Sequence, residues 1–161
     1  MRITVAAGAV AGLVAGVVFG LMMQMMSAPG PGGSPVPMMM MVAQVVGSSS
    51  VAVGWLYHLF NSALIGAVFG LLLGGRIGES IPRGVALGAG YGLGWWVLGG
   101  LILMPVFLGM PPFAPLRMPP MRPVAMGSLV GHLVYGVVLG AVLARLLGRA
   151  REPLVHAPRH G

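Results

Sequence analysis

Four stretches of this chain are almost purely apolar over about 20 residues each, and this feature limits the fold more than any other. They cover residues 3–26, 51–73, 84–104 and 125–147, and none contains an acidic or basic residue before its last turn. A helix needs roughly 20 residues to cross the hydrocarbon core of a bilayer, where every backbone polar group must be hydrogen-bonded within its own segment. The sequence therefore predicts an all-α membrane protein with four transmembrane helices.

The charge content excludes a soluble domain of this length. Only 7% of the 161 residues are charged, compared with about 25% in an ordinary soluble domain, and 57% are hydrophobic. The chain has no cysteine, which excludes disulfides, thiolate metal sites and thiol nucleophiles. We expect one transmembrane domain over residues 1–148, with lipid as its main solvent, and a disordered cytoplasmic tail over residues 149–161.

All nine basic residues are arginines, and they lie singly at the ends of the apolar segments rather than in one patch. This distribution argues against a nucleic-acid partner and is typical of topology signals, because cytoplasmic loops carry the excess of basic residues. The outer side has only Arg117 and Arg122, and its first connection is uncharged. We therefore expect a multi-pass protein of the cytoplasmic (inner) membrane with both termini in the cytoplasm. The arginines of the cytoplasmic side are Arg2, Arg76, Arg83, Arg145, Arg149, Arg151 and Arg159.

Both outer connections have unusual compositions. The first begins with a stretch rich in proline and glycine, and its methionine-rich part at 36–46 predicts a short amphipathic or re-entrant helix at the membrane interface. The second, at 105–123, carries seven prolines and cannot be helical for long.

The chain contains an internal repeat. Residues 58–69 and 132–143 both begin with His-Leu and share Gly-Ala-Val in the same register, and Gly8 and Gly12 of the first helix correspond to Gly84 and Gly88 of the third. The chain thus reads as two helical hairpins that both start on the cytoplasmic side. Such parallel repeats are related by a pseudo-two-fold axis along the membrane normal, so the two histidines should lie at equal depth.

Small residues recur at every fourth position on the predicted helices. Residues four apart share a helix face, and small ones allow backbones to approach closely in tight right-handed crossings. These glycine zippers predict a packed four-helix bundle, and they leave self-association open. The expected helix-packing positions are Gly8, Gly12, Gly16, Gly20, Ser62, Gly66, Gly70, Gly136 and Gly140.

His58 and His132 lie within these small-residue faces, so each should point into a helix–helix contact rather than toward lipid. Asn61 follows His58 by one turn. An ionisable group inside a membrane is costly and is by default a hypothesis of function. Three interpretations stay open for the pair: an interhelical hydrogen bond alone, a metal or haem site, or the handling of a proton or solute.

Methionines concentrate at the outer ends of the helices and in the outer connections. Thioether sulfur combined with imidazole suits Cu(I), whereas two facing imidazoles would suit the axial positions of haem b. Methionine also fills irregular apolar gaps in ordinary packing, so the cofactor stays undetermined. The candidate ligand residues are His58, His132, Asn61, Met22, Met26 and Met104.

The chain offers little for catalysis. Glu79 and Glu152 are its only acidic residues, and both belong to the cytoplasmic rim, far from His58 and His132. No carboxylate pair, nucleophile–base pair or phosphate-binding loop can be assembled. We therefore expect a protein that is not an enzyme and has no catalytic residues.

The second half of the chain combines the glycine-rich third helix with Met104-Pro-Val-Phe-Leu-Gly-Met-Pro-Pro-Phe and Gly131-His132-Leu-Val-Tyr. In these motifs it resembles the YagU-like group of small bacterial inner-membrane proteins. The first half is similar more loosely, through its glycine-rich helix and His58, and differs in a shorter outer connection and more methionine. The resemblance implies the four-helix layout. It implies no reaction, because the group has no established biochemical activity.

Two functions follow from the sequence. The first is a ligand-handling membrane protein with an intramembrane His58/His132 site in the outer half of the bundle for a metal, haem or small solute. The alternative is a structural or accessory subunit that docks with other membrane subunits and has no ligand of its own. Imidazole rings close enough to share one ion or one macrocycle would favour the first function, and distant rings with separate partners would oppose it.

Overall fold

A computed structural model of the chain describes residues 2–30 and 33–150. Four long helical stretches dominate it: α1 (Arg2–Gln24), α3 (Val51–Ile77), α7 (Arg122–Arg149), and a third stretch that begins with α4 (Ile81–Trp95) and continues to Phe107. Each is long and apolar enough to cross a membrane. This confirms the predicted all-helical fold with four candidate membrane spans. The predicted tail lies almost wholly outside the described residues.

Three of the four long helical stretches extend beyond the apolar segments that predicted them, whereas α1 ends at Gln24 and not at residue 26. α3 continues to Ile77 and ends at Gly78, whose φ of 55° is a left-handed conformation that glycine adopts without strain. α4 begins at Ile81, where the Ser80 side chain accepts a hydrogen bond from the Arg83 backbone and a proline occupies the first turn. Hydrophobicity marks only the lipid-facing part of a helix, whereas capping residues set its ends.

The third span changes its helical type partway. Its segment η2 (Trp96–Leu103) is a π-helix, and α5 (Met104–Phe107) completes the span. A π-helical segment is wider than an α-helix and is frequently found at functional sites. Here it lies at the level of His132, because Gly99 and Gly100 both face that ring.

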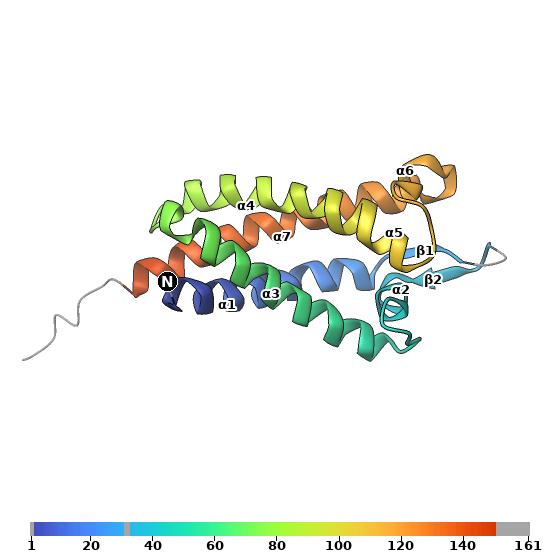
Figure 1. The fold of residues 1–161 in the computed structure, drawn as a ribbon, viewed down its shortest axis with the longest axis horizontal. Coiled ribbons are helices and arrows are strands. Elements are labelled where there is room, and N and C mark those ends of the chain that lie inside the picture. The colour runs from blue at the N-terminus through green and yellow to red at the C-terminus, as the bar shows by residue number, and fades with distance from the viewer. Residues whose placement is uncertain (1, 31–32, 151–161) are drawn as a thin grey trace, which may run out of the picture.

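The two ends of the bundle differ (Figure 1). The N-terminus, the α3–α4 connection and the end of α7 lie together at what we call the arginine-rich end. The opposite end, the loop end, carries the short elements of both long connections (Figure 1). These elements are β1 (Ser27–Pro29), β2 (Pro35–Pro37), α2 (Met38–Gln44), α6 (Ala114–Arg117) and the 3-10 helix η3 (Pro119–Met121).

The short helix expected in the first connection is α2, and it packs on α3, where the Met39 backbone approaches Gly54. The antiparallel pairing of β1 with β2 was not predicted. The proline-rich second connection contains only single turns of helix, as its composition predicted.

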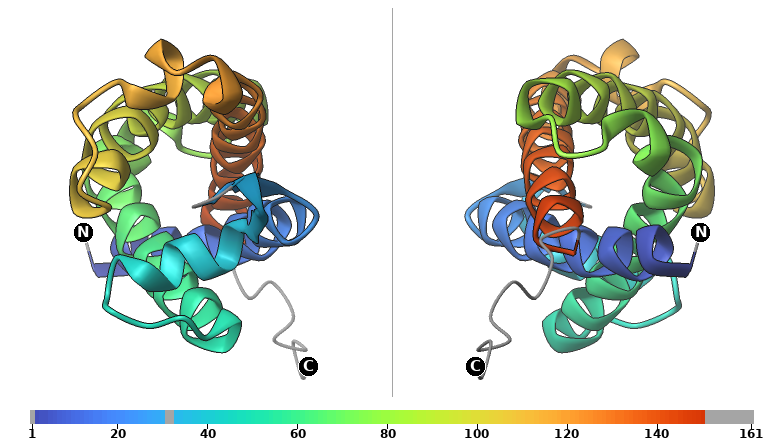
Figure 2. Two further views of the ribbon diagram at one scale, coloured as in Figure 1. Left: turned by 90° about the vertical axis from the view of Figure 1, so that its right-hand side faces the viewer. Right: turned by 90° about the vertical axis from the view of Figure 1, so that its left-hand side faces the viewer.

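The helices pack as two hairpins, α1 with α3 and α4 with α7, and α1 lies against α7 between them (Figure 2). A Cβ atom on Gly8 would overlap the Gly66 carbonyl oxygen, and one on Gly84 would overlap that of Gly140. Gly88 has the same relation to Gly136. Gly16 and Gly20 instead face the side chains of Ser62 and Trp55. The expected small-residue positions that lie at backbone-to-backbone contacts inside the hairpins are Gly8, Gly12, Gly66, Gly70, Gly136 and Gly140.

Candidate functional site

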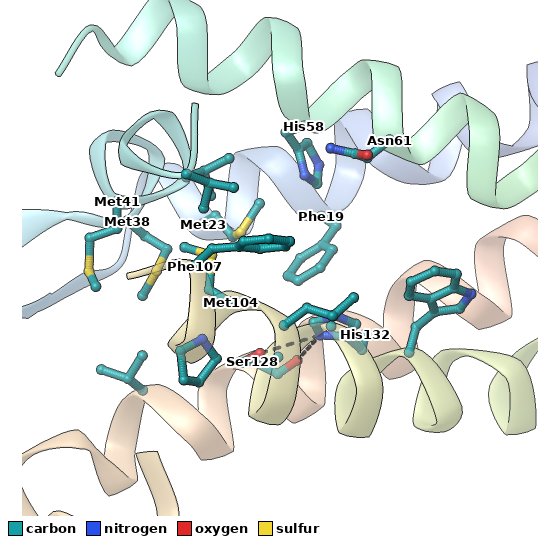
Figure 3. A pocket seen from close by; sticks show the side chains of 18 of the residues that line it. Phe19, Met23, Met38, Met41, His58, Asn61, Met104, Phe107, Ser128 and His132 are labelled. Atoms are coloured by element: carbon teal, nitrogen blue, oxygen red, sulfur yellow. Dashed lines mark hydrogen bonds between the residues drawn. The ribbon is translucent and has the colours of Figure 1, made fainter. Parts of the chain in front are cut away.

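A cavity of about 500 Å³ lies within the loop-end half of the bundle (Figure 3). Its walls come from α1, α3, α7 and the η2–α5 stretch, with α2 at the loop end. Most lining side chains are apolar, and none is acidic, lysine or arginine. The size and lining are those of a small-molecule site, in which a few polar groups fix the orientation of a bound molecule.

His58 reaches the cavity from α3, and a backbone carbonyl fixes its tautomer. Its Nε2 atom lies 2.9 Å from the carbonyl oxygen of Gly16 on α1. A carbonyl oxygen can only accept, so Nε2 must carry the hydrogen. In the neutral ring, Nδ1 is then a bare acceptor.

His132 reaches the cavity from α7 with the opposite tautomer. Its Nδ1 atom lies 2.8 Å from the Ser128 carbonyl oxygen one turn earlier and 3.3 Å from the Ser128 hydroxyl. Nδ1 must therefore donate, which leaves Nε2 as the bare acceptor. This nitrogen faces the π-helical segment, because a Cβ atom on Gly99 would lie 3.9 Å from it.

Both bare nitrogens border open space. Among the described residues, no buried side-chain nitrogen or oxygen lacks a hydrogen-bond partner. Neither His58 Nδ1 nor His132 Nε2 has a hydrogen-bond partner within residues 2–30 and 33–150, so neither atom is fully buried. Both residues line the cavity. The site thus offers two hydrogen-bond acceptors, or two metal-ligating nitrogens, in otherwise apolar surroundings.

The Phe19 ring of α1 stands between the two imidazoles (Figure 3). Its centroid lies 5.6 Å from that of His58 and 4.9 Å from that of His132, both in edge-on arrangements. The structure therefore brings the two histidines into one site, but they do not face each other across an empty gap. A haem held by both imidazoles would need the space that Phe19 fills.

Neighbouring polar groups link the helices around the site. Asn61 lines the cavity beside His58 and donates from Nδ2 to the Tyr57 carbonyl at 2.9 Å. Tyr135 of α7 donates its hydroxyl hydrogen to the Ser62 carbonyl of α3 at 2.8 Å. This last bond connects the two hairpins next to the cavity.

Methionines make up much of the remaining wall. Of the candidates from the sequence, Met26 and Met104 line the cavity and Met22 does not. Within the described part of the chain, no three His, Asp or Glu side chains gather in one place. Five further methionines also line the cavity: Met23, Met38, Met41, Met110 and Met121.

Sequence reasoning did not assign Phe19 or Ser128 to the site, although both line the cavity. Phe19 gave no signal, because a phenylalanine in an apolar helix looks the same whether it faces lipid or a cavity. Ser128 did give a signal, since it precedes His132 by one turn on the same small-residue face.

No protein-family model matches the chain, and neither the search of curated proteins nor that of solved structures finds a match, so a function must be argued from the cavity itself.

Proposed function

We propose that the chain is a multi-pass protein of the cytoplasmic membrane that binds a small molecule in the cavity at His58 and His132 and is not an enzyme. One observation carries the proposal: two bare imidazole nitrogens border a cavity of about 500 Å³ whose lining is otherwise mostly apolar. Ordinary packing would fill such a space, and ordinary structural histidines would have partners at both nitrogens.

The proposed orientation places the arginine-rich end in the cytoplasm and the loop end, with the cavity, outside. Arg2, Arg76, Arg83, Arg145 and Arg149 belong to the arginine-rich end, whereas the loop end has Arg117 and Arg122. The excess of arginine supports this orientation through the positive-inside rule.

The proposed duplication is supported by the helix packing. The repeat matches Gly8 with Gly84 and Gly66 with Gly140, and these residues make equivalent close approaches in the two hairpins. The proposed repeat is broken at the site, where His58 bonds to another helix and His132 to its own. Two chemically different nitrogens suit an unsymmetrical ligand.

Native mass spectrometry of the purified protein in detergent tests the proposal. We expect a bound small molecule on the wild-type protein and its loss from the double variant His58→Phe/His132→Phe, which keeps aromatic rings in place. The control is Leu56→Ala, because Leu56 lies on α3 but is 73% exposed and does not line the cavity. A wild-type protein that is free of any small molecule and co-purifies with other membrane subunits would contradict ligand binding and support the accessory role.

A further inference from the structure

The cavity has a side opening toward the bilayer. Leu64 and Val68 of α3 line the cavity, and so do Leu103 of η2 and Phe107 of α5, yet all four are exposed on the surface, Leu64 by 53% and Phe107 by 59%. α3 packs on α4 over a short stretch only, and hardly at all on η2 or α5. The wall between α3 and α5 is therefore open.

On α3 this opening lies near the middle of the span, and on the third span it lies toward the loop end, at Leu103 and Phe107. Leu64 is the central residue of α3, which spans Val51–Ile77. Within this stretch of α3, the Tyr91 hydroxyl of α4 donates to the Ile65 carbonyl at 2.9 Å and ties α3 to α4. At the loop end, α2 lies across the bundle (Figure 2), and its Met39 side chain is fully buried. The open route into the cavity thus faces acyl chains rather than water.

The chemistry inside the cavity limits what can occupy it. The lining has no charged side chain to balance a charged headgroup, and burying an unpaired charge there would be costly. His58 Nδ1 and His132 Nε2 can each accept one hydrogen bond. The flexible methionine side chains adapt to an irregular apolar body.

We infer that the occupant is an uncharged amphiphile from the bilayer, an apolar molecule with a hydroxyl head, which passes between α3 and α5 and donates its hydroxyl hydrogen to the bare nitrogen of His58 or of His132. The inference rests on the proposed function and adds the ligand class and the route. A soft metal ion fits the geometry less well, because the Phe19 ring stands between the two imidazoles (Figure 3).

Photolabelling in phosphatidylcholine vesicles tests the recognition of the hydroxyl group. The probes are a long-chain primary alcohol with a diazirine in its chain, and the methyl ether of the same molecule. We expect the alcohol to label cavity residues, to be displaced by excess unlabelled alcohol, and to label about 3- to 10-fold more than the ether, which lacks the donor. Equal labelling by alcohol and ether would overturn the inference.

Two variants with matched controls test the site and the route without removing a histidine. The side chain introduced by Gly99→Val would lie against His132 Nε2 and should lower alcohol labelling. Gly94→Val, on the same span, places its side chain in open space and should leave labelling unchanged. Leu64→Trp narrows the opening and should slow labelling, whereas Leu71→Trp, on an exposed part of α3 away from the cavity, should not. Unchanged labelling in both test variants would overturn the inference.

Titration with Ag(I) separates this inference from the proposed function. One outcome is stoichiometric Ag(I) binding that is lost in Met26→Leu/Met104→Leu, together with no specific alcohol labelling. This outcome would overturn the inference that the ligand is an amphiphile, but it would support ligand binding in the cavity. A protein that binds neither probe and carries no small molecule would overturn both.

Discussion

The two histidines have different tautomers because each donates to a backbone carbonyl through a different nitrogen. Solid-state NMR of ¹⁵N-histidine-labelled protein in lipid at a pH where both rings are neutral measures this directly. We predict a protonated Nε2 for His58 and a protonated Nδ1 for His132, because Gly16 and Ser128 present carbonyl acceptors to these atoms. The chain has four histidines, so the variants His58→Asn and His132→Asn would identify the signals of these two rings. Two rings with the same tautomer would contradict the geometry of the site.

The Tyr135 hydroxyl makes a buried hydrogen bond between the hairpins. We expect Tyr135→Phe to lower the free energy of unfolding by about 1 kcal/mol, because the Ser62 carbonyl loses a donor that water does not replace. Tyr57→Phe is the matched control, since the Tyr57 hydroxyl makes no hydrogen bond within the described residues. Unfolding in mixed micelles with increasing sodium dodecyl sulfate measures both. Equal stability of the two variants would show that the bond contributes nothing.

Some residues of the site could be predicted from the sequence and others could not. His58 and His132 could be placed inside the bundle because they lie on small-residue faces, and Met26 and Met104 because they end their spans on the cavity side. Phe19 could not, since nothing in an apolar helix distinguishes a phenyl ring that faces lipid from one between two imidazoles. The sequence also could not predict which ring nitrogens are bare, because the tautomer of each histidine depends on which backbone carbonyl lies within hydrogen-bond distance in the folded protein.

At the scale of elements, the spans were predictable because a length of about 20 apolar residues has one stable solution in lipid. The π-helix Trp96–Leu103 was not, because its hydrogen-bond register leaves no mark in composition. The strand pair β1–β2 was missed because each strand has only three residues and most of them are unusual for a sheet. Local geometry of this kind is set by tertiary contacts.

Glycines on one helix differ sharply in what surrounds them. A Cβ atom on Gly88 would overlap the Gly136 carbonyl, whereas one on Gly90 would meet nothing within 4 Å. We expect Gly88→Ala to lower the free energy of unfolding by about 1–3 kcal/mol through overpacking of α4 against α7. Gly90→Ala should be neutral or stabilising, because alanine favours helix and has room. Detergent unfolding of the two proteins compares them, and similar losses would refute close packing in this hairpin.

At the scale of the whole molecule, the absence of cysteine makes the orientation easy to measure. We expect Ser49→Cys, at the loop end, to react with a membrane-impermeant maleimide in cells whose outer membrane and cell wall have been removed but whose cytoplasmic membrane is intact. Ala150→Cys, at the arginine-rich end, should react only after the membrane is permeabilised. Any label is confined to the introduced thiol. The reverse labelling pattern would show that the protein has the opposite orientation, with the cavity on the cytoplasmic side.

The contrast between contacts inside and between the hairpins has a mechanical consequence. Within each hairpin, backbone lies directly on backbone at several glycines, so separating the two helices would expose main chain there. Between hairpins, side chains such as Phe19 and Tyr135 make the contact, and side chains can adopt other rotamers. The molecule thus consists of two rigid helical hairpins and a more deformable interface between them. A bound molecule that is larger than the cavity will therefore separate the two hairpins at this interface, while the packing inside each hairpin stays unchanged.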